Sequence, residues 1–173
     1  MSKVNGKNKG NAFERQIANL LSERFQKHLG IEKGFRRNPD SGSFFGGKNE
    51  SRVESYDQDF ALFGDLICPR AFMYSVECKN YKTPPSFASF LSGSITEWEK
   101  WIAQAMSDSR KSNKSMLLII KYNNVPEFVL TDRPLVGQPG RFKYGPYDVY
   151  TLADFISADD SFYFSTADEK TAR

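Results

Sequence analysis

The sequence predicts a single α/β domain in which helices flank a mixed β-sheet. Two observations lead to this fold class. Segments whose apolar residues recur at helical spacing alternate with short runs of aliphatic and aromatic residues. The chain of 173 residues, 39% of them hydrophobic, is also long enough for one domain with a core. We expect residues 1–10 to be a flexible basic arm, residues 11–156 the domain, and residues 157–173 an acidic tail.

The first helix is expected over residues 11–29, and Gly30 ends it. Asn11 is a suitable N-cap, and Glu14, three residues later, completes a capping-box pattern. Glu14 also lies at the edge of the apolar stripe, so we expect it to face partly inward. His28 is expected to be a partly exposed helix residue rather than a catalyst. The apolar stripe consists of Phe13, Ile17, Leu20, Leu21 and Phe25.

Short strands should follow the first helix. Residues 35–38 read as an extended stretch, and residues 39–58 as a loop rich in Gly, Ser, Pro and Asp. Strands are then predicted over residues 60–68 and 72–81, with a turn at Pro69-Arg70.

The second half of the chain continues the pattern. Pro84-Pro85 breaks the chain, and a helix begins at Ser94 or Thr96. Residues 115–122 form an apolar run of the buried-strand type. Residues 127–131 are a further strand, residues 133–146 are loop-rich, and residues 147–155 form a last short strand or helix. The apolar face of the second helix contains Trp98, Trp101, Ile102 and Ala105, which we assign to the core rather than to base stacking.

Three acidic or basic side chains can meet on the paired strands. Glu77 and Lys79 are two residues apart, so they project from the same face while Cys78 projects from the other. If the two strands are neighbours, Asp65 can join them. Two carboxylates and an ammonium group suit a divalent cation held next to a phosphate. The alternatives are an ordinary exposed Glu-x-Lys pair and an Asp that only forms a turn.

Composition sets further limits. The net charge is +3, with nine Lys/Arg against four Asp/Glu in residues 1–40, which fits a nucleic-acid partner or an ordinary solvated surface. Cys68 and Cys78 are expected to be buried thiols, and with one His they form no zinc pattern. No apolar run is long enough to span a membrane, and no secretory signal is visible. We therefore expect a cytoplasmic protein, in the host cytoplasm if it is viral.

Several motifs in order give the chain a family resemblance. Lys9-Gly10-Asn11-Ala12-Phe13-Glu14-Arg15, Arg36-Arg37, Ser41-Gly42-Ser43, Asp65 and Glu77-x-Lys79 resemble the motifs of the PD-(D/E)xK nuclease superfamily. They are similar in particular to archaeal-type Holliday junction resolvases, which also occur in viruses and phages. The resemblance covers residues 9–122 and implies a restriction-endonuclease-like core. The chain departs from the family in having Gly64 where proline usually precedes the Asp, and in the length of residues 43–65.

The resemblance also implies roles for individual residues. Asp65 and Glu77 would hold Mg²⁺, which Mn²⁺ could replace, together with the main-chain carbonyl of Cys78, and Glu14 would reach the metal directly or through water. Lys79 would activate the attacking water and stabilise charge on the phosphate. The implied DNA-binding residues are Lys9, Arg15, Arg36, Arg37, Ser41, Ser43 and Gln104, of which Gln104 is the weakest candidate because glutamine is usually exposed.

These roles predict a homodimeric endonuclease acting on branched DNA, because a four-way junction has two strands to cut. Three alternatives stay open on the sequence alone. The first is a nuclease of the same superfamily that acts on another DNA substrate, such as a restriction or repair enzyme. The second is a non-catalytic nucleic-acid-binding domain with the same fold. The third is an interaction protein whose motifs are coincidental.

Overall fold

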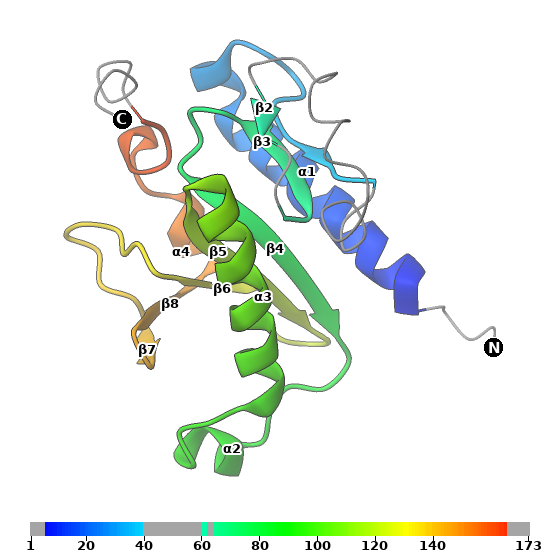
Figure 1. Ribbon diagram of the computed structural model, residues 1–173, viewed down its shortest axis with the longest axis vertical. Helices are drawn as coiled ribbons and strands as arrows, with labels where there is room; N and C mark the ends of the chain where they lie inside the picture. The colour runs from blue at the N-terminus through cyan, green and yellow to red at the C-terminus, as the bar shows by residue number, and fades with distance from the viewer. Residues whose placement is uncertain (1–5, 40–59, 62–63, 166–173) are drawn as a thin grey trace.

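The computed structural model describes residues 6–39, 60–61 and 64–165, and Figure 1 shows their arrangement. The first half of the chain contains α1 (Gly6–Leu29), β1 (Arg36–Arg37), β2 (Phe60–Ala61), β3 (Leu66–Pro69), β4 (Tyr74–Tyr81) and α2 (Phe87–Leu91). The second half contains α3 (Thr96–Ser112), β5 (Ser115–Tyr122), β6 (Phe128–Thr131), β7 (Phe142–Tyr144), β8 (Tyr147–Thr151), α4 (Leu152–Ile156) and a 3₁₀ turn (Asp160–Phe162). Among these described helices, none has the length and apolar character that crossing a bilayer requires.

A mixed five-stranded sheet forms the centre of the domain, in the order β4-β5-β6-β8-β7. Strands β4 and β5 are parallel, and α2 and α3 make the connection between them. The remaining pairs are antiparallel. A smaller set of strands, β1-β3-β2, lies beside the edge of β4 that is away from β5 (Figure 1). This arrangement confirms the predicted restriction-endonuclease-like α/β core.

Helices α1 and α3 cover opposite faces of the β4–β5 pair, because alternate strand residues face alternate sides. One core cluster joins α1 to Val76 and Cys78 of β4 and to Leu117 and Ile119 of β5. The other cluster joins α3 to Met116, Leu118 and Ile120 of β5. Glu77 lies opposite Leu118 in the strand register, and Lys79 lies opposite Ile120, so both polar residues face α3.

Several predicted elements are confirmed. Strand β5 has the predicted bounds, and α3 begins at Thr96, one of its two predicted starts. Residues 147–155 contain both alternatives, because β8 leads directly into α4. Both cysteines are buried and free. The predicted core face of α3 is also correct, with Trp98, Trp101, Ile102 and Ala105 all buried.

Other predictions are wrong. Helix α1 begins at Gly6, so residues 6–10, assigned to the arm, are helical and Asn11 is no N-cap. Helix α2 and strand β7 lie where only a chain break and a loop were expected. The loop predicted at residues 39–58 lies almost wholly outside the described residues.

The predicted strand 60–68 is not continuous. Its two ends form β2 and β3, which pair with each other in antiparallel register, with Phe60 opposite Pro69. The chain therefore reverses between them, next to Gly64. Gly64 has φ +75°, and a Cβ at this position would lie 2.4 Å from the carbonyl oxygen of Val76. Proline cannot adopt this φ, whereas glycine can, so the residue found here suits the backbone conformation.

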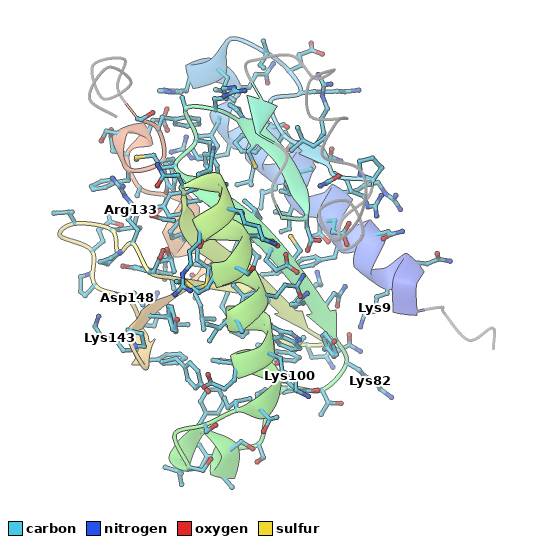
Figure 2. All side chains as sticks on the ribbon, viewed as in Figure 1. Lys9, Lys82, Lys100, Arg133, Lys143 and Asp148 are labelled. Carbon is cyan, nitrogen blue, oxygen red and sulfur yellow. The ribbon has the colours of Figure 1, made fainter. Side chains whose placement is uncertain are left out.

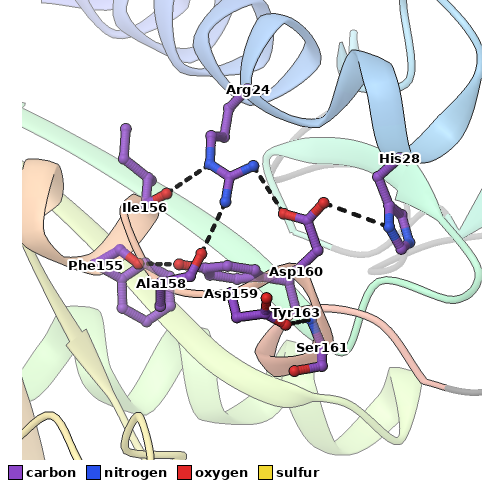
Figure 3. A network of polar contacts seen from close by, with 9 residues as sticks. All are labelled: Arg24, His28, Phe155, Ile156, Ala158, Asp159, Asp160, Ser161 and Tyr163. Carbon is purple, nitrogen blue, oxygen red and sulfur yellow. Dashed lines mark hydrogen bonds and ion pairs between the residues drawn. The ribbon is translucent and has the colours of Figure 1, made fainter.

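Residues 157–165 pack onto α1, although residues 157–173 were expected to be a tail, and residues 166–173 lie outside the described part of the chain. Tyr163 and Phe164 are buried, and Phe164 forms a β-bridge with Phe72. Figure 3 shows how Arg24 of α1 holds this segment. Its guanidinium donates to the carbonyl oxygens of Ile156 (2.7 Å) and Ala158 (2.8 Å), and pairs with the carboxylate of Asp160. His28 of α1 is exposed at the same contact, as predicted, and stacks on Phe164.

Candidate active site

Asp65 lies at the outer edge of β4, on the side away from β5, where the chain turns into β3. Its main-chain N–H donates to the carbonyl oxygen of Val76 at 2.8 Å. Its carboxylate Oδ2 accepts from the N–H of Cys78 at 2.9 Å. The N–H and carbonyl of one strand residue point to the same side, so the Cys78 carbonyl also faces this edge. The Asp65 carboxylate and the Cys78 carbonyl therefore lie on the same edge of β4, as the implied ligand set requires.

Glu77 and Lys79 project together from β4 toward α3, as the strand alternation predicts. Lys79 Nζ donates to Glu77 Oε1 at 2.5 Å, and the Glu77 side chain is almost fully buried. Gln104 of α3 contacts both partners. Its Nε2 donates to Glu77 Oε1 at 2.6 Å, and its Oε1 accepts from Lys79 Nζ at 3.0 Å. Gln104 therefore fixes the relative position of the acid and the base.

Only one of the two oxygens of the Glu77 carboxylate has hydrogen-bond partners. Its Oε2 atom is buried without a hydrogen-bond partner. Burial, together with the negative charge of Asp65, raises the pKa of Glu77 to about 8, and the nearby Lys79 ammonium only partly offsets this. A buried carboxylate oxygen without a partner is unfavourable unless a cation or proton donor satisfies it.

Glu14 lies on the α1 side of the same edge. Its Oε2 accepts from Arg37 Nε at 2.7 Å, and Arg37 Nη2 donates to Asn11 Oδ1 at 2.9 Å. Burial raises the pKa of Glu14, and the charge of Asp65 adds to this effect. Glu14 and Asp65 are thus close enough to interact electrostatically. In this arrangement Arg37 holds the Glu14 side chain, whereas the resemblance assigns Arg37 to DNA phosphates.

The other candidate residues lie apart from this centre or outside the description. Lys9 is on the first turns of α1, where its Nζ donates to Asn123 Oδ1 at 3.2 Å. Arg15 and Arg36 are exposed, on α1 and β1. Ser41 and Ser43 lie outside the described residues. The structure thus brings together Glu14, Asp65, Glu77, Lys79 and Gln104.

The contacts of two residues at the site were not foreseen from the sequence. Asn11 was assigned to the helix end, but it binds Arg37. Asn38 was not singled out, yet its N–H donates to the Asp65 carbonyl at 2.8 Å and its Nδ2 to the Gly64 carbonyl at 3.1 Å. Asn38 directly follows the Arg36-Arg37 pair, which was the only available signal for it.

An apolar cavity of about 300 Å³ lies elsewhere, between α2 and the sheet. Its lining includes Phe90, Trp98, Tyr122 and Phe128 and contains no carboxylate. This cavity therefore lacks the carboxylates that a metal site needs, and the edge of β4 has them.

The donor set at the edge of β4 fits a divalent cation that keeps several waters. In the described part of the chain, no three His, Cys, Asp or Glu side chains converge as a preformed cluster. Mg²⁺ needs only one or two protein carboxylates in addition to water. Asp65 and Glu77 provide two, and the unpartnered Glu77 Oε2 is an available ligand atom.

Comparison with known families agrees with this chemistry. The model of a family described as "Phage putative PDDEXK endonuclease" matches residues 5–139, which include every residue of the site. No curated protein and no solved structure matches the chain significantly. Nucleases of the PD-(D/E)xK type generally use divalent metals.

Proposed function

Because the chain belongs to the phage PDDEXK endonuclease family, we propose that it is a Mg²⁺-dependent endodeoxyribonuclease that cuts four-way DNA junctions as a homodimer. The observation that supports it best is the arrangement on β4. Asp65 accepts from the Cys78 N–H, while Glu77 and Lys79 project next to it with one buried carboxylate oxygen unsatisfied. The proposal includes action in the host cytoplasm, where phage DNA is present.

Asp65, Glu77 and the Cys78 carbonyl are the groups that would hold Mg²⁺, with Mn²⁺ able to replace it. A bound divalent ion supplies an acidified water and polarises a phosphate oxygen. The unpartnered Glu77 Oε2 is the donor atom that this assignment explains.

Lys79 has the chemistry to act on the phosphate itself. Its ammonium is held by Glu77 Oε1 and Gln104 Oε1, so it is fixed before substrate binds. The surrounding carboxylates outweigh burial and raise the pKa of Lys79, which keeps it charged at neutral pH. A fixed cation of this kind stabilises the charge that develops on phosphate oxygens during hydrolysis.

The Glu14–Arg37 pair forms the opposite wall of the site. Arg37 keeps the Glu14 carboxylate directed along the α1 side of the edge, near Asp65. Glu14 is therefore positioned to accept a hydrogen bond from a water at the centre, and Arg37 acts through Glu14 as a positioning residue.

Specificity for four-way junctions rests on the resemblance of the ordered motifs to those of resolvases. A symmetric junction presents two equivalent strands, and a two-fold dimer would present two equivalent sites to them. The same centre could serve a nuclease that cuts another DNA structure, so the substrate has to be tested directly.

The test is a panel of labelled four-way junction, flap, single-stranded and duplex DNA incubated with the purified protein, with Mg²⁺ or with EDTA. We expect Mg²⁺-dependent paired nicks near the branch of the junction, and none with Glu77→Gln. Equal cutting of plain duplex would refute junction specificity but retain the nuclease. Absence of metal-dependent cleavage of every DNA in the panel would refute the enzymatic function.

A further inference from the structure

Tyr81 is an exposed aromatic residue immediately beyond the catalytic side chains of β4. It is the last residue of the strand, and 43% of its surface is exposed. Its ring packs against buried Trp101 of α3, with ring centroids 4.6 Å apart and planes tilted by 38°. The ring is therefore supported from one side while much of it stays accessible to solvent.

The strand repeat places Tyr81 in line with the catalytic residues. Glu77, Lys79 and Tyr81 are successive alternate residues of β4, so all three project on the α3 face. Each step of two strand residues is about 7 Å. A DNA strand rises about 3.4 Å per nucleotide in a duplex, so the step from Lys79 to Tyr81 corresponds to about two nucleotides.

Helix α3 runs alongside these three residues in the direction opposite to that of β4. Gln104 contacts Glu77 and Lys79, and Trp101, almost one turn earlier, contacts Tyr81. Lys100 is four residues before Gln104, so it lies one turn away on the same side of α3. Lys100 therefore lies on a part of α3 that is nearer to Tyr81 than Gln104 is.

Lysines surround this end of β4. Figure 2 shows Lys9, Lys82 and Lys100 around the C-terminal end of the strand. Lys9 Nζ donates to Asn123 Oδ1, and the Asn123 N–H donates to the Lys82 carbonyl, which links the first two. Within the described residues, neither Lys82 nor Lys100 forms an ion pair with a carboxylate.

We propose that Tyr81 is a stacking platform for an unpaired nucleobase next to the cleaved bond, and that Lys82 and Lys100 bind the flanking phosphates. An accessible aromatic ring beside unpaired cations is the combination that binds single-stranded DNA without sequence preference. This inference rests on the proposed nuclease function and narrows its substrate class to DNA with unstacked nucleotides at the cleavage site, such as branch points.

Binding is measured in EDTA, so that the DNA stays intact, by fluorescence anisotropy with a forked DNA and a fully paired duplex of the same length. We expect Tyr81→Ala to weaken binding to the fork about 5- to 150-fold, the usual range for loss of one base–aromatic stack. Binding to the duplex should change less than about threefold. Tyr81→Phe retains the ring and should bind both DNAs like the wild type.

The fluorescent base 2-aminopurine, placed at successive unpaired positions of the fork, reports stacking directly. We expect quenching at one position with the wild type and with Tyr81→Phe, and no quenching with Tyr81→Ala. Equal weakening of fork and duplex by Tyr81→Ala, or unchanged quenching, would overturn the platform.

The phosphate contacts have their own readout. The slope of log K against log salt on single-stranded DNA should fall by about 0.7 for each of Lys82→Gln and Lys100→Gln. Lys143→Gln is the matched control, because Lys143 pairs with Asp148 at 2.9 Å and lies away from this end of β4 (Figure 2). Unchanged slopes for Lys82→Gln and Lys100→Gln would overturn these contacts.

Failure of this inference can be told apart from failure of the proposed function. If the wild type cleaves DNA with Mg²⁺ but Tyr81→Ala binds fork and duplex as the wild type does, the nuclease stands and the platform is wrong. If the wild type does not cleave any DNA, the function is wrong, while the binding data still decide on the platform.

Discussion

Replacing Glu77 by glutamine should make the metal-free protein more stable at pH 8 while abolishing its activity. The Glu77 side chain is 2% exposed, and one carboxylate oxygen lacks a partner. Glutamine has nearly the same shape, and its carbonyl oxygen can still accept from Lys79 and Gln104. The substitution therefore removes the buried charge and its ion pair with Lys79, and it retains the shape of the side chain.

The magnitude follows from the two pKa values of Glu77. In the folded protein the pKa is raised from 4.5 to about 8, so the folded state keeps a proton that the unfolded chain releases. The part of the unfolding free energy that depends on Glu77 is therefore fully present below pH 4.5 and is lost as the pH rises toward 8. The free energy of unfolding therefore falls by at most about 5 kcal/mol from below pH 4.5 to above pH 8, at 1.36 kcal/mol per pKa unit.

The assay is urea unfolding of the wild type and Glu77→Gln in EDTA at several pH values from 5 to 8.5. We expect the free energy of unfolding of the wild type to fall across this range by several kcal/mol relative to that of the variant. Divalent metal should restore stability to the wild type at pH 8, by about 2.7 kcal/mol at a concentration 100 times its Kd, and not to the variant.

Glu127→Gln is a matched control for the buried acid. Glu127 pairs with Lys121, and this contact lowers its pKa, so its stabilising effect is lost only as the pH falls below 4.5. Its substitution should shift stability by a constant amount from pH 5 to 8.5. If Glu77→Gln is less stable than the wild type at pH 8 without metal, the argument from the buried charge is refuted.

Three further predictions follow from the packing and contacts around the site. Gly64→Ala should destabilise the protein by about 2 kcal/mol more than Gly93→Ala, as measured by urea unfolding. Both glycines have positive φ, but only the Cβ at residue 64 would meet the Val76 carbonyl. Equal effects of the two substitutions would contradict this close approach. Arg24→Ala should lower the free energy of unfolding by about 2–4 kcal/mol, because it loses the contacts with Ile156, Ala158 and Asp160. Lys27 is exposed, so Lys27→Ala should change this free energy by less than about 0.5 kcal/mol. Similar values for the two variants would show that the C-terminal segment does not depend on Arg24. Gln104→Ala should reduce kcat for DNA cleavage about 10- to 100-fold with little change in KM, because Gln104 positions Glu77 and Lys79. Ser107 is exposed on the same helix, so Ser107→Ala should leave kcat unchanged. A change in KM alone would assign Gln104 to substrate binding instead.

The central strand and the shared face of Glu77 and Lys79 could be predicted from the sequence because they depend on simple periodicity. Alternation along β4 determined that Glu77 and Lys79 share a face and that Cys78 lies on the other. The apolar stripe of α3 likewise predicted its buried face, which the structure confirms for Trp98 and Trp101.

The region before β4 could not be predicted in the same way. Residues 60–68 contain enough apolar residues for one strand, but the chain reverses near Gly64 because this residue fits against the Val76 carbonyl. That contact joins residues twelve positions apart, and no local pattern indicates it. The C-terminal segment is a similar case, because burial of Tyr163 and Phe164 depends on a surface formed by α1 and β4.

The contacts of the candidate site show the same division. A local pattern suggested a capping role for Asn11, whereas its partner is Arg37, 26 positions away in the chain. Gln104 was the weakest candidate because glutamine is usually exposed, and only the packing of α3 on β4 brings it to Glu77 and Lys79. The proximity of Glu77 and Lys79 was thus accessible from the sequence, and their contacts with Gln104 were not.

The most direct test of the account is a crystal structure of the wild type soaked in Mn²⁺, with the ion located by its anomalous signal. The account predicts one strong peak at the edge of β4 that is away from β5, between the carboxylates of Asp65 and Glu77 and next to the Cys78 carbonyl. It predicts no peak there in crystals of Glu77→Gln. A peak at another site, or an edge of β4 that remains without metal while the same protein cleaves DNA with Mn²⁺, would contradict it.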